Sequence, residues 1–312
     1  MFDAIYTGTE TRDPYITDQL LQQYESYLVF RYFENIKPGG NLGGWVDTFS
    51  TLYVDRYAEQ LWNTLFAKAP EITLFNWSPM VSRDALEPGD RAAWQSKATS
   101  FDWAAMAKGH TTPGWARAAG YSLEQVDAFL HKLGKPIGIA SYKPYHSSGE
   151  DFLHNYLGNV GIPIELYPHF PTSADIVLLT EAAKQDPEIV AKIKAQLTAG
   201  KKVMITSGLL QALQGKGIED IVELEYTGRK VAIRDFLDGY GAGNGTSLND
   251  PRQEHPAVLF PEIRFYTNDT WALIRGVANA KGFPILLMNR YSRGIFYVLT
   301  IPDNIGDLYS LP

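Results

Sequence analysis

Two carboxylates and a tryptophan each lie at the carboxyl end of one of the first three predicted strands of this chain. These residues are Glu10, Asp47 and Trp77, and a second tryptophan, Trp45, stands two positions before Asp47. A carboxylic acid that donates a proton, paired with a carboxylate that acts as base or nucleophile, is the basis of general acid and base catalysis. An aromatic ring beside such a pair offers a flat apolar surface to a ligand. The chemistry depends on whether the fold brings these side chains together.

Apolar runs alternate with amphipathic stretches over the first 80 residues. The pattern predicts strands near residues 2–7, 42–49 and 71–77, with helices near residues 17–35 and 55–69 between them. This order is typical of a parallel sheet, because parallel neighbours need a long crossover connection. We therefore expect the three strand ends to lie at one edge of a sheet.

The second half of the chain repeats the alternation after a different stretch. Residues 80–121 are predicted to be short helices and loops, and the Ser122 capping box predicts a helix to about residue 133. Strands are expected at residues 136–142, 163–167, 176–180 and 203–208, with helices at 149–157, 186–200, 209–214 and 270–278. Residues 220–234 alternate like paired antiparallel strands, residues 240–251 form a Gly/Asn-rich loop, and residues 285–289 and 295–301 form a closing hairpin. Together these elements predict a doubly wound α/β sheet with an antiparallel edge.

Composition excludes several classes of function. The chain has 28 basic and 35 acidic residues and a net charge of −7, so we expect no nucleic-acid partner. No apolar run approaches the length of a membrane span, so no membrane partner is expected. The absence of cysteine excludes disulfides and thiolate metal sites. His146 and His154 lack the spacing of a zinc motif, and the loop over residues 239–245 lacks the Lys-Ser/Thr of a phosphate loop, so we expect no metal and no cofactor.

Five segments of the second half carry a family resemblance. They resemble the glutamine-amidotransferase-like, flavodoxin-like domain that follows the catalytic barrel of bacterial β-galactosidases, where it is called the trimerisation domain. The segments are Ile139–Pro144, Gly149–His154, Pro168–Pro171, Val203–Gly208 and Tyr297–Pro302. Class I amidotransferases use a cysteine at a strand-to-helix elbow, and the matching elbow here has Ser207. The resemblance therefore implies a noncatalytic domain, with Ser207 either a helix N-cap or a substitute nucleophile.

The resemblance extends to the first 80 residues, which are similar to the last three strand-helix units of a (β/α)₈ glycoside-hydrolase barrel. Such barrels present functional side chains at the carboxyl ends of their strands. The resemblance thus implies Glu10 and Asp47 as the catalytic carboxylates of glycosidic-bond hydrolysis. It implies four substrate-binding residues, which are Arg12, Trp45, Asn76 and Trp77. The glycosidases of the largest barrel clan have Glu where this chain has Asp47, and five strands of a barrel are missing, so we expect a piece of a longer enzyme.

The expected fold class is α/β. A partial (β/α) barrel segment over residues 1–80 and a linker over 81–134 precede a flavodoxin-like, class I amidotransferase-like doubly wound sheet over 135–312. The expected function is that of the C-terminal portion of a carbohydrate-active enzyme, with a carbohydrate substrate and homo-oligomeric assembly, such as a trimer. A nonenzymatic oligomerisation module is the alternative, and a hydrolase centred on Ser207 is a third. Each candidate residue also has a purely structural interpretation. Glu10 would pair with Arg12, Asp47 would accept backbone hydrogen bonds in a tight turn, and Trp45 and Trp77 would pack in the core or at the rim.

Overall fold

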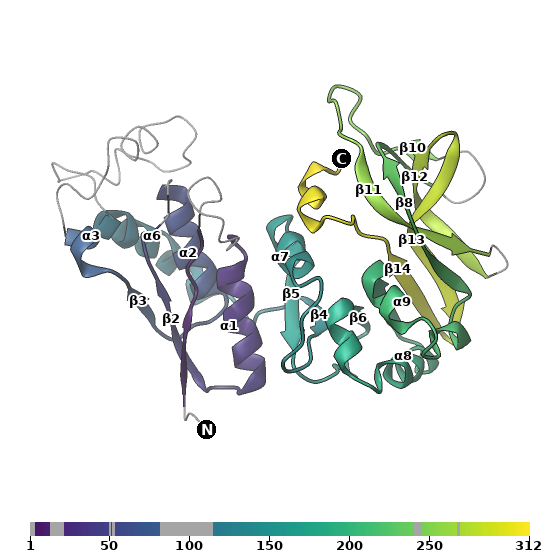
Figure 1. Cartoon of the computed structure of the whole chain (residues 1–312). Helices are drawn as coiled ribbons and strands as arrows, with labels where there is room; N and C mark the ends of the chain where they lie inside the picture. Colours follow the sequence, from purple (N-terminus) through teal and green to yellow (C-terminus); the bar gives the residue numbers. More distant parts are fainter. Residues whose placement is uncertain are drawn as a thin grey trace. The chain divides into compact units, whose positions relative to one another are not determined.

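The computed structural model describes residues 4–12, 22–49, 51, 54–81, 115–239, 245–266 and 269–312 (Figure 1). The chain divides into two compact units. The first unit contains residues 1–138 with 157–165, and the second contains residues 139–156 with 166–312. Both units combine helices with sheets, so the mixed α/β class expected from the sequence is confirmed.

The first unit is built around a three-stranded parallel sheet. Its strands lie in the order β1-β2-β3, with β2 paired to β1 on one side and to β3 on the other. The strands are β1 (Ile5–Gly8), β2 (Asn41–Val46) and β3 (Ile72–Leu74). The helices are α1 (Glu25–Ile36), α2 (Val54–Phe66), α3 (Trp77–Val81) and α6 (Trp115–Leu130). The predicted alternation of strands and helices is therefore confirmed, and the carboxyl ends of the three strands share one edge.

A small apolar core fixes this sheet against its helices. Val46 of β2 packs with Tyr57 and Leu61 of α2 and with Trp115 of α6. Tyr57 and Leu61 are one helical turn apart, which places both on the buried face of α2. Gly44 in β2 is needed at this layer, because a Cβ there would lie 2.8 Å from the Thr64 side chain.

Helix α6 differs from the prediction at its start. The sequence predicts that Ser122 caps a helix, but α6 begins at Trp115, so Ser122 lies inside it. The Ser122 hydroxyl donates to the carbonyl of Ala118, 2.6 Å away and one turn earlier, instead of capping. Burial of Trp115 against Tyr57, with ring centroids 5.2 Å apart, explains why the helix extends toward its amino end.

The second unit contains most of a nine-stranded mixed sheet, in the order β10-β9-β12-β13-β14-β7-β6-β4-β5. Strands β4, β6, β7 and β14 pair in parallel, as the α/β prediction requires. The strands of this half are β4 (Ile139–Tyr142), β5 (Ile164–Tyr167), β6 (Ile176–Leu179), β7 (Lys202–Thr206) and β14 (Gly294–Leu299). The helices are α7 (Phe152–Asn159), α8 (Ile189–Thr198) and α9 (Ser207–Leu213), with short 3₁₀ turns η1 (Glu181–Gln185), η2 (Ile218–Asp220) and η3 (Ile305–Ser310).

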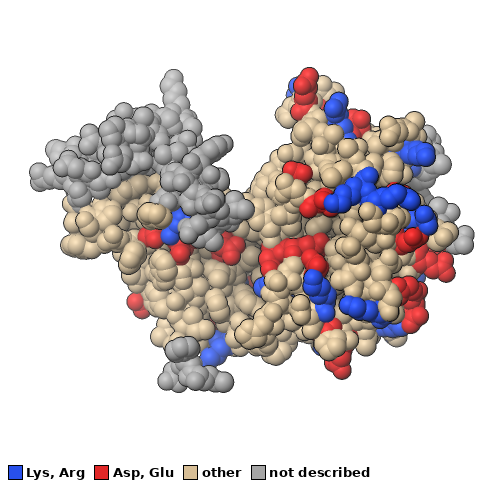
Figure 2. All heavy atoms as spheres, in the orientation of Figure 1, with Lys and Arg blue, Asp and Glu red and all other residues tan. Residues whose placement is uncertain are grey.

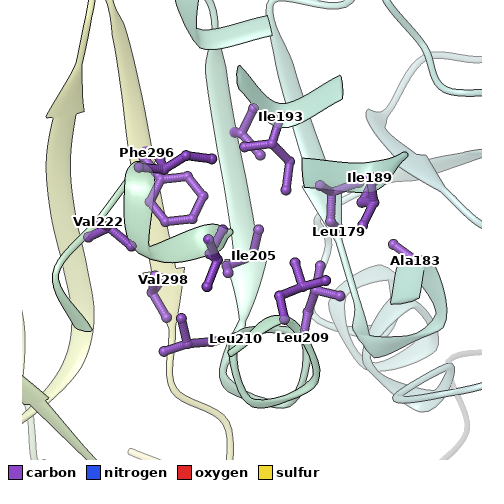
Figure 3. Close-up of a cluster of buried hydrophobic side chains, with 14 of the residues drawn as sticks. Leu179, Ala183, Ile189, Ile193, Ile205, Leu209, Leu210, Val222, Phe296 and Val298 are labelled. Atoms are coloured by element: carbon purple, nitrogen blue, oxygen red, sulfur yellow. The ribbon is translucent and has the colours of Figure 1, made fainter. Parts of the chain in front are cut away.

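The core of this unit lies between the parallel strands and helices α8 and α9. Figure 3 shows Ile205 of β7 with Phe296 and Val298 of β14, and Leu209 and Leu210 of α9. All five side chains are at most 1% exposed. Burial along most of β6 and over Val203 and Ile205 of β7 accounts for the apolar runs of these strands, since strands covered on both faces have no polar side.

The antiparallel half corrects one helix prediction. Residues 270–278, predicted to be helical, form strand β12 (Thr270–Ala278), which pairs with β9 on one side and β13 on the other. A Cβ at Gly276 would lie 2.5 Å from the Ile233 side chain, so the backbone of β12 packs closely against Ile233 at this position. Pairing on both edges satisfies the backbone and overrides a weak helical pattern.

The remaining strands complete this half. The predicted hairpin is confirmed, because β13 (Lys281–Tyr291) pairs antiparallel with β14. Residues 220–234, predicted to form paired strands, contain a single strand, β8 (Leu224–Ile233), which pairs with the distant β11 (Val258–Phe265). The others are β9 (Asp235–Asp238) and β10 (Thr246–Ser247), and residues 240–244 of the predicted loop lie outside the described residues.

Candidate functional site

Glu10, Arg12 and Asp47 meet at the carboxyl edge of the three-stranded sheet. Arg12 holds both oxygens of Asp47, with Nη1 2.8 Å from Oδ1 and Nη2 3.1 Å from Oδ2. The same Nη2 is 3.8 Å from Oε1 of Glu10. Arg12 is 7% exposed and Asp47 5%, so the two-pronged ion pair is largely shielded from water.

The loop after β2 orients the ion pair. The backbone N–H of Phe49 donates to Oδ1 of Asp47 at 3.0 Å, which closes a tight turn at the strand end. The Arg12 guanidinium lies over the Phe49 ring, 5.4 Å from its centroid. Arg12 also donates to its neighbour, the carbonyl of Thr11, at 3.0 Å. The structure therefore has Asp47 in both the turn and the ion pair.

Glu10 is less completely bonded than Asp47. Its Oε2 atom is buried and has no hydrogen-bond partner. Burial raises the pKa of the Glu10 carboxyl above its usual value, and the nearby Asp47 carboxylate also raises it, while a backbone hydrogen bond and Arg12 lower it. A carboxyl whose pKa is raised by burial can hold a proton that a general acid must deliver.

Two residues next to Glu10 also have buried polar atoms without a partner. These atoms are the hydroxyl of Thr11, which is 1% exposed, and Nε of Arg12. Buried polar groups in proteins are nearly always hydrogen-bonded, so three unpaired atoms on consecutive residues are unusual. Sequence reasoning missed Thr11, and the only available signal was its place between two candidate site residues.

Aromatic side chains surround this edge. Trp77 is 77% exposed and Phe49 is 66% exposed. Trp45 is half-buried, and its ring lies 5.7 Å from that of Phe75 at an angle of 56°. Asn76 is exposed, and its side-chain oxygen is 3.4 Å from the backbone N–H of Ser78. The structure thus leaves Trp77 open to a ligand and packs Trp45 against a neighbour, and Phe49 and Phe75 are aromatic residues that the sequence analysis did not select.

The predicted elbow in the second unit has no nucleophilic arrangement. The N-cap of α9 is Thr206, whose hydroxyl accepts from the N–H of Leu209 at 3.3 Å. Ser207 is 2% exposed, and its hydroxyl accepts from the N–H of Ile301 at 3.2 Å. The N-cap interpretation of Ser207 is therefore wrong by one residue. A serine nucleophile needs a base within hydrogen-bond reach, whereas the Ser207 hydroxyl is bonded to a backbone amide.

The two candidate histidines lie in different surroundings. His154 is 1% exposed, and its Nε2 is 2.8 Å from the buried hydroxyl of Ser141. Burial lowers the pKa of the His154 imidazole to about 4, so the ring is neutral near pH 7. His146 is exposed. Within the described part of the chain, no group of three or more His, Asp or Glu side chains could hold a metal ion.

Charge is mixed on the surface of the second unit. Figure 2 shows basic and acidic side chains side by side on the face that it draws. Two ion pairs of this unit, Arg229 with Glu262 and Arg264 with Glu225, join β8 to β11, and Lys230 of β8 pairs with Asp303, which lies outside the strands. Among the residues that the structure describes, no helix is long and apolar enough to span a membrane.

Two family models match the chain, and together they account for most of its length. Residues 1–132 match the model described as probable glycosyl hydrolase, catalytic domain, so the first region is glycoside-hydrolase-like. Residues 134–304 match the model described as uncharacterized protein SSO3021, second domain. Because this second match covers more than half of the chain, the protein belongs to the SSO3021 second-domain family. The amidotransferase-like identity of this region stays a prediction.

Similarity to solved structures is distant. Gan42B, a GH42 β-galactosidase from G. stearothermophilus, has 10% sequence identity and a TM-score of 0.48, with 92% of this chain and 45% of that chain covered. An α-L-fucosidase isoenzyme 2 from Paenibacillus thiaminolyticus has 14% identity and a TM-score of 0.48, with coverage of 88% and 43%. A cytoplasmic protein, STM1381 from Salmonella typhimurium LT2, has 14% identity and a TM-score of 0.36, with coverage of 53% and 87%. The chain spans less than half the length of the two glycosidases, and no curated protein matches it.

Proposed function

We propose that this chain is part of a carbohydrate-active hydrolase and that the carboxyl edge of β1, β2 and β3 carries its sugar site. The observation that supports this most is the meeting of Glu10 and Asp47 at one guanidinium, on the strand edge where barrel enzymes place catalytic groups. The glycoside-hydrolase-like match over residues 1–132 covers all of these residues. The proposed substrate is a glycoside.

In this proposal the two carboxyl groups have different roles. Glu10, whose pKa is raised by burial, holds a proton and delivers it to the glycosidic oxygen as the bond to the anomeric carbon breaks. Asp47, kept in place by Arg12 and the Phe49 amide, is the second carboxylate, which stabilises positive charge at the anomeric carbon or activates water. The exposed ring of Trp77 is available for packing against a sugar face, as proposed from the sequence.

A binding site without hydrolysis is the second candidate. Both oxygens of Asp47 already accept hydrogen bonds from Arg12, which supports a structural role for this carboxylate. The edge would then bind a saccharide, and the chain would work as a nonenzymatic interaction module. In both candidates the second unit is a noncatalytic, amidotransferase-like association domain, which the backbone-bonded Ser207 and the absence of cysteine support.

The deciding experiment measures hydrolysis and binding together. The chain is incubated with 4-nitrophenyl glycosides of galactose, glucose, mannose and fucose, and release of nitrophenol is followed from pH 4 to pH 8. We expect turnover that Glu10→Gln abolishes and that Glu71→Gln, an exposed carboxylate before β3, leaves unchanged. Saccharide binding without turnover would favour the second candidate. If the chain shows no saccharide binding and no turnover, the proposed sugar site is contradicted.

Assembly is tested separately by sedimentation velocity. The association role proposed for the second unit predicts a homo-oligomer such as a trimer. A monomer over the whole concentration range would contradict this part of the proposal, and it would leave the sugar site untouched.

A further inference from the structure

One row of directly paired residues crosses six strands of the large sheet, on the face opposite the main core. The row runs over β4, β6, β7, β14, β13 and β12 and consists of Ser141, Leu178, Met204, Tyr297, Met288 and Trp271. Neighbours of these residues along the strands, such as Val203, Phe296 and Leu287, belong to the core that α8 and α9 cover. Because side chains alternate between the two faces of a strand, the row faces away from α8 and α9.

Helix α7 covers only the beginning of this row. The ring of His154 in α7 is hydrogen-bonded to the Ser141 hydroxyl, and Ser141 and Leu178 are 0% and 2% exposed. The other four side chains are half-buried, and none of them belongs to an apolar core of the described residues. We call the surface around these four the outer sheet face, with residues Met204, Trp271, Leu286, Met288, Ile295, Tyr297 and Leu299.

The outer sheet face is apolar where a face in water would be polar. Antiparallel strands that are solvated on one side usually alternate apolar with polar residues. In β14, however, Ile295, Tyr297 and Leu299 lie on the outer face, and Phe296 and Val298 lie in the core. A strand that is apolar on both sides is typical of a sheet with a layer on each face. The pattern therefore predicts a covering layer on this face.

Three cations accompany the apolar side chains. Lys202 and Arg290 both pair with Ile295 at one end of the face, and Arg275 of β12 lies nearer the other end. Within the described part of the chain, none of the three cations has an ion pair. Strands β7, β12, β13 and β14 contain no acidic residue, and Asp235 of β9 is an acid that the alternation places on this side. The face is thus basic in a chain whose net charge is −7.

The size and charge of the outer sheet face favour an acidic amphipathic helix as its partner. From Pro284 to Arg290, β13 advances about 20 Å, which equals the length of about 13 helical residues. Helices are the usual layer on a parallel or mixed sheet, and α7 takes this place over β4. A second copy fits less well, because two such faces would bring cations against cations.

We propose that the outer sheet face binds an acidic amphipathic helix of a partner protein. The apolar side of that helix packs on the row from Met204 to Trp271, and its acidic side chains pair with Lys202, Arg290 and Arg275. This surface lies in the second unit and is independent of the sugar site, so the inference goes beyond the proposed function.

Two synthetic peptides test the proposal by fluorescence. Both are helices of about 18 residues with one leucine face, and the flanking positions are glutamate in one peptide and lysine in the other. Because the chain has no cysteine, Met288→Cys accepts an environment-sensitive dye at the outer sheet face only. Ala232→Cys, at an exposed position of β8, carries the control label. We expect a blue shift from the label at position 288 alone, and about tenfold or more tighter binding of the glutamate peptide at low ionic strength.

Charge reversal tests the named cations. Lys202→Glu combined with Arg290→Glu should weaken binding of the glutamate peptide about tenfold or more and strengthen binding of the lysine peptide. Lys132→Glu combined with Lys216→Glu, two exposed lysines elsewhere, is the matched control and should leave both affinities unchanged. Equal affinity for the two peptides, no binding of either, or a folded Lys202→Glu and Arg290→Glu variant that binds normally would overturn the inference.

Two other occupants are tested with the same variant. If sedimentation velocity shows a homo-oligomer that Lys202→Glu with Arg290→Glu dissociates, the face belongs to a second copy and the inference is overturned. If the chain binds phosphatidylserine vesicles through these two residues and does not bind the glutamate peptide, the partner is a lipid surface and the inference is again overturned. The glycoside assays decide the proposed function separately, since neither cation belongs to the sugar site.

Discussion

Glu10 in the first unit and Glu150 in the second are both partly buried glutamates, and desolvation raises the pKa of each carboxyl. Their hydrogen bonding differs. Glu150 accepts from the Thr206 hydroxyl, from the N–H of Glu181 at 2.8 Å and from the N–H of Gly208 at 3.2 Å. Oε2 of Glu10 has no partner. The pKa is thus raised both in Glu150, whose carboxylate accepts three hydrogen bonds, and in Glu10, whose Oε2 accepts none.

An unusual backbone conformation at Glu150 accompanies its three hydrogen bonds. Glu150 has a φ of 57°, in the left-handed region that side chains other than glycine seldom adopt. Gly149 before it has a φ of 142°, and a Cβ there would lie 2.9 Å from the backbone nitrogen of Ala182. Glu150 therefore ties together the loops that follow β4, β6 and β7. The comparison teaches that a raised pKa marks a candidate ligand site only where hydrogen-bonding capacity is also left over.

The largest expected effect comes from breaking the ion pair beside Glu10. Arg12→Met should destabilise the first unit by about 3–5 kcal/mol, because Asp47 is left buried without its partner. Urea unfolding followed by tryptophan fluorescence reports this unit, since all seven tryptophans except Trp271 precede residue 139. The double variant with Asp47→Leu should recover part of the loss. An unchanged midpoint for Arg12→Met would show that the pair contributes nothing to stability.

Acidification should affect the second unit through His154. The pKa of this imidazole is about 4 in the folded protein against about 6.5 in the unfolded chain, so the unfolded state binds the proton first. The His154 contribution to stability is present above pH 6.5 and is lost as the pH falls through 4, by about 3 kcal/mol in all. Chemical denaturation followed by circular dichroism at several pH values should show this loss. His154→Asn should remove that part of the pH dependence, and an identical slope in the variant would contradict the assignment.

Removing the bonded glutamate is expected to cost less. Glu150→Ala leaves a hydroxyl and two backbone N–H groups without their acceptor, and we expect a loss of about 2 kcal/mol. The measurement is the urea midpoint and slope of the second unit, followed by circular dichroism. If Glu150→Ala is as stable as the unmodified chain, water replaces the carboxylate and the contrast with Glu10 disappears.

The smallest effect is expected at Glu10 itself. Glu10→Gln should change the free energy of unfolding by less than about 0.5 kcal/mol at pH 7, because Oε2 has no bond to lose and a neutral amide is easier to bury than a carboxylate. The same substitution at Glu150 should be clearly destabilising, which makes the two variants a matched pair. Equal losses in thermal or urea unfolding would mean that both glutamates are structural.

Much of the fold was predictable because its signals are local. The three strand ends near Glu10, Asp47 and Trp77 follow from apolar periodicity and from the rule that parallel strands share a carboxyl edge. Strand β12 was not predictable in this way, because its residues 270–278 are compatible with a helix until β9 and β13 supply partners. Strand β8 likewise finds its partner β11 only through a long-range pairing.

Some residues of the candidate site were likewise predictable from the sequence, and others were not. The sequence selected Glu10 and Asp47 because each lies at a strand end, and the family resemblance added Arg12 as a substrate-binding residue, but Thr11, Phe49 and Phe75 carried no signal of their own. That Arg12 bonds both oxygens of Asp47 while Glu10 keeps one unpaired is a matter of side-chain geometry across 35 residues of chain separation.

The amino-acid sequence by itself determined the alternating elements, the acidic character and the absence of thiol chemistry, since these depend on composition and on neighbours a few positions apart. Only the tertiary structure decided which strands pair, which glutamate is fully bonded and which polar atoms stay unpaired. The reason is that burial and hydrogen bonding depend on which distant residues the fold brings together, and several acceptors can compete for the same donor.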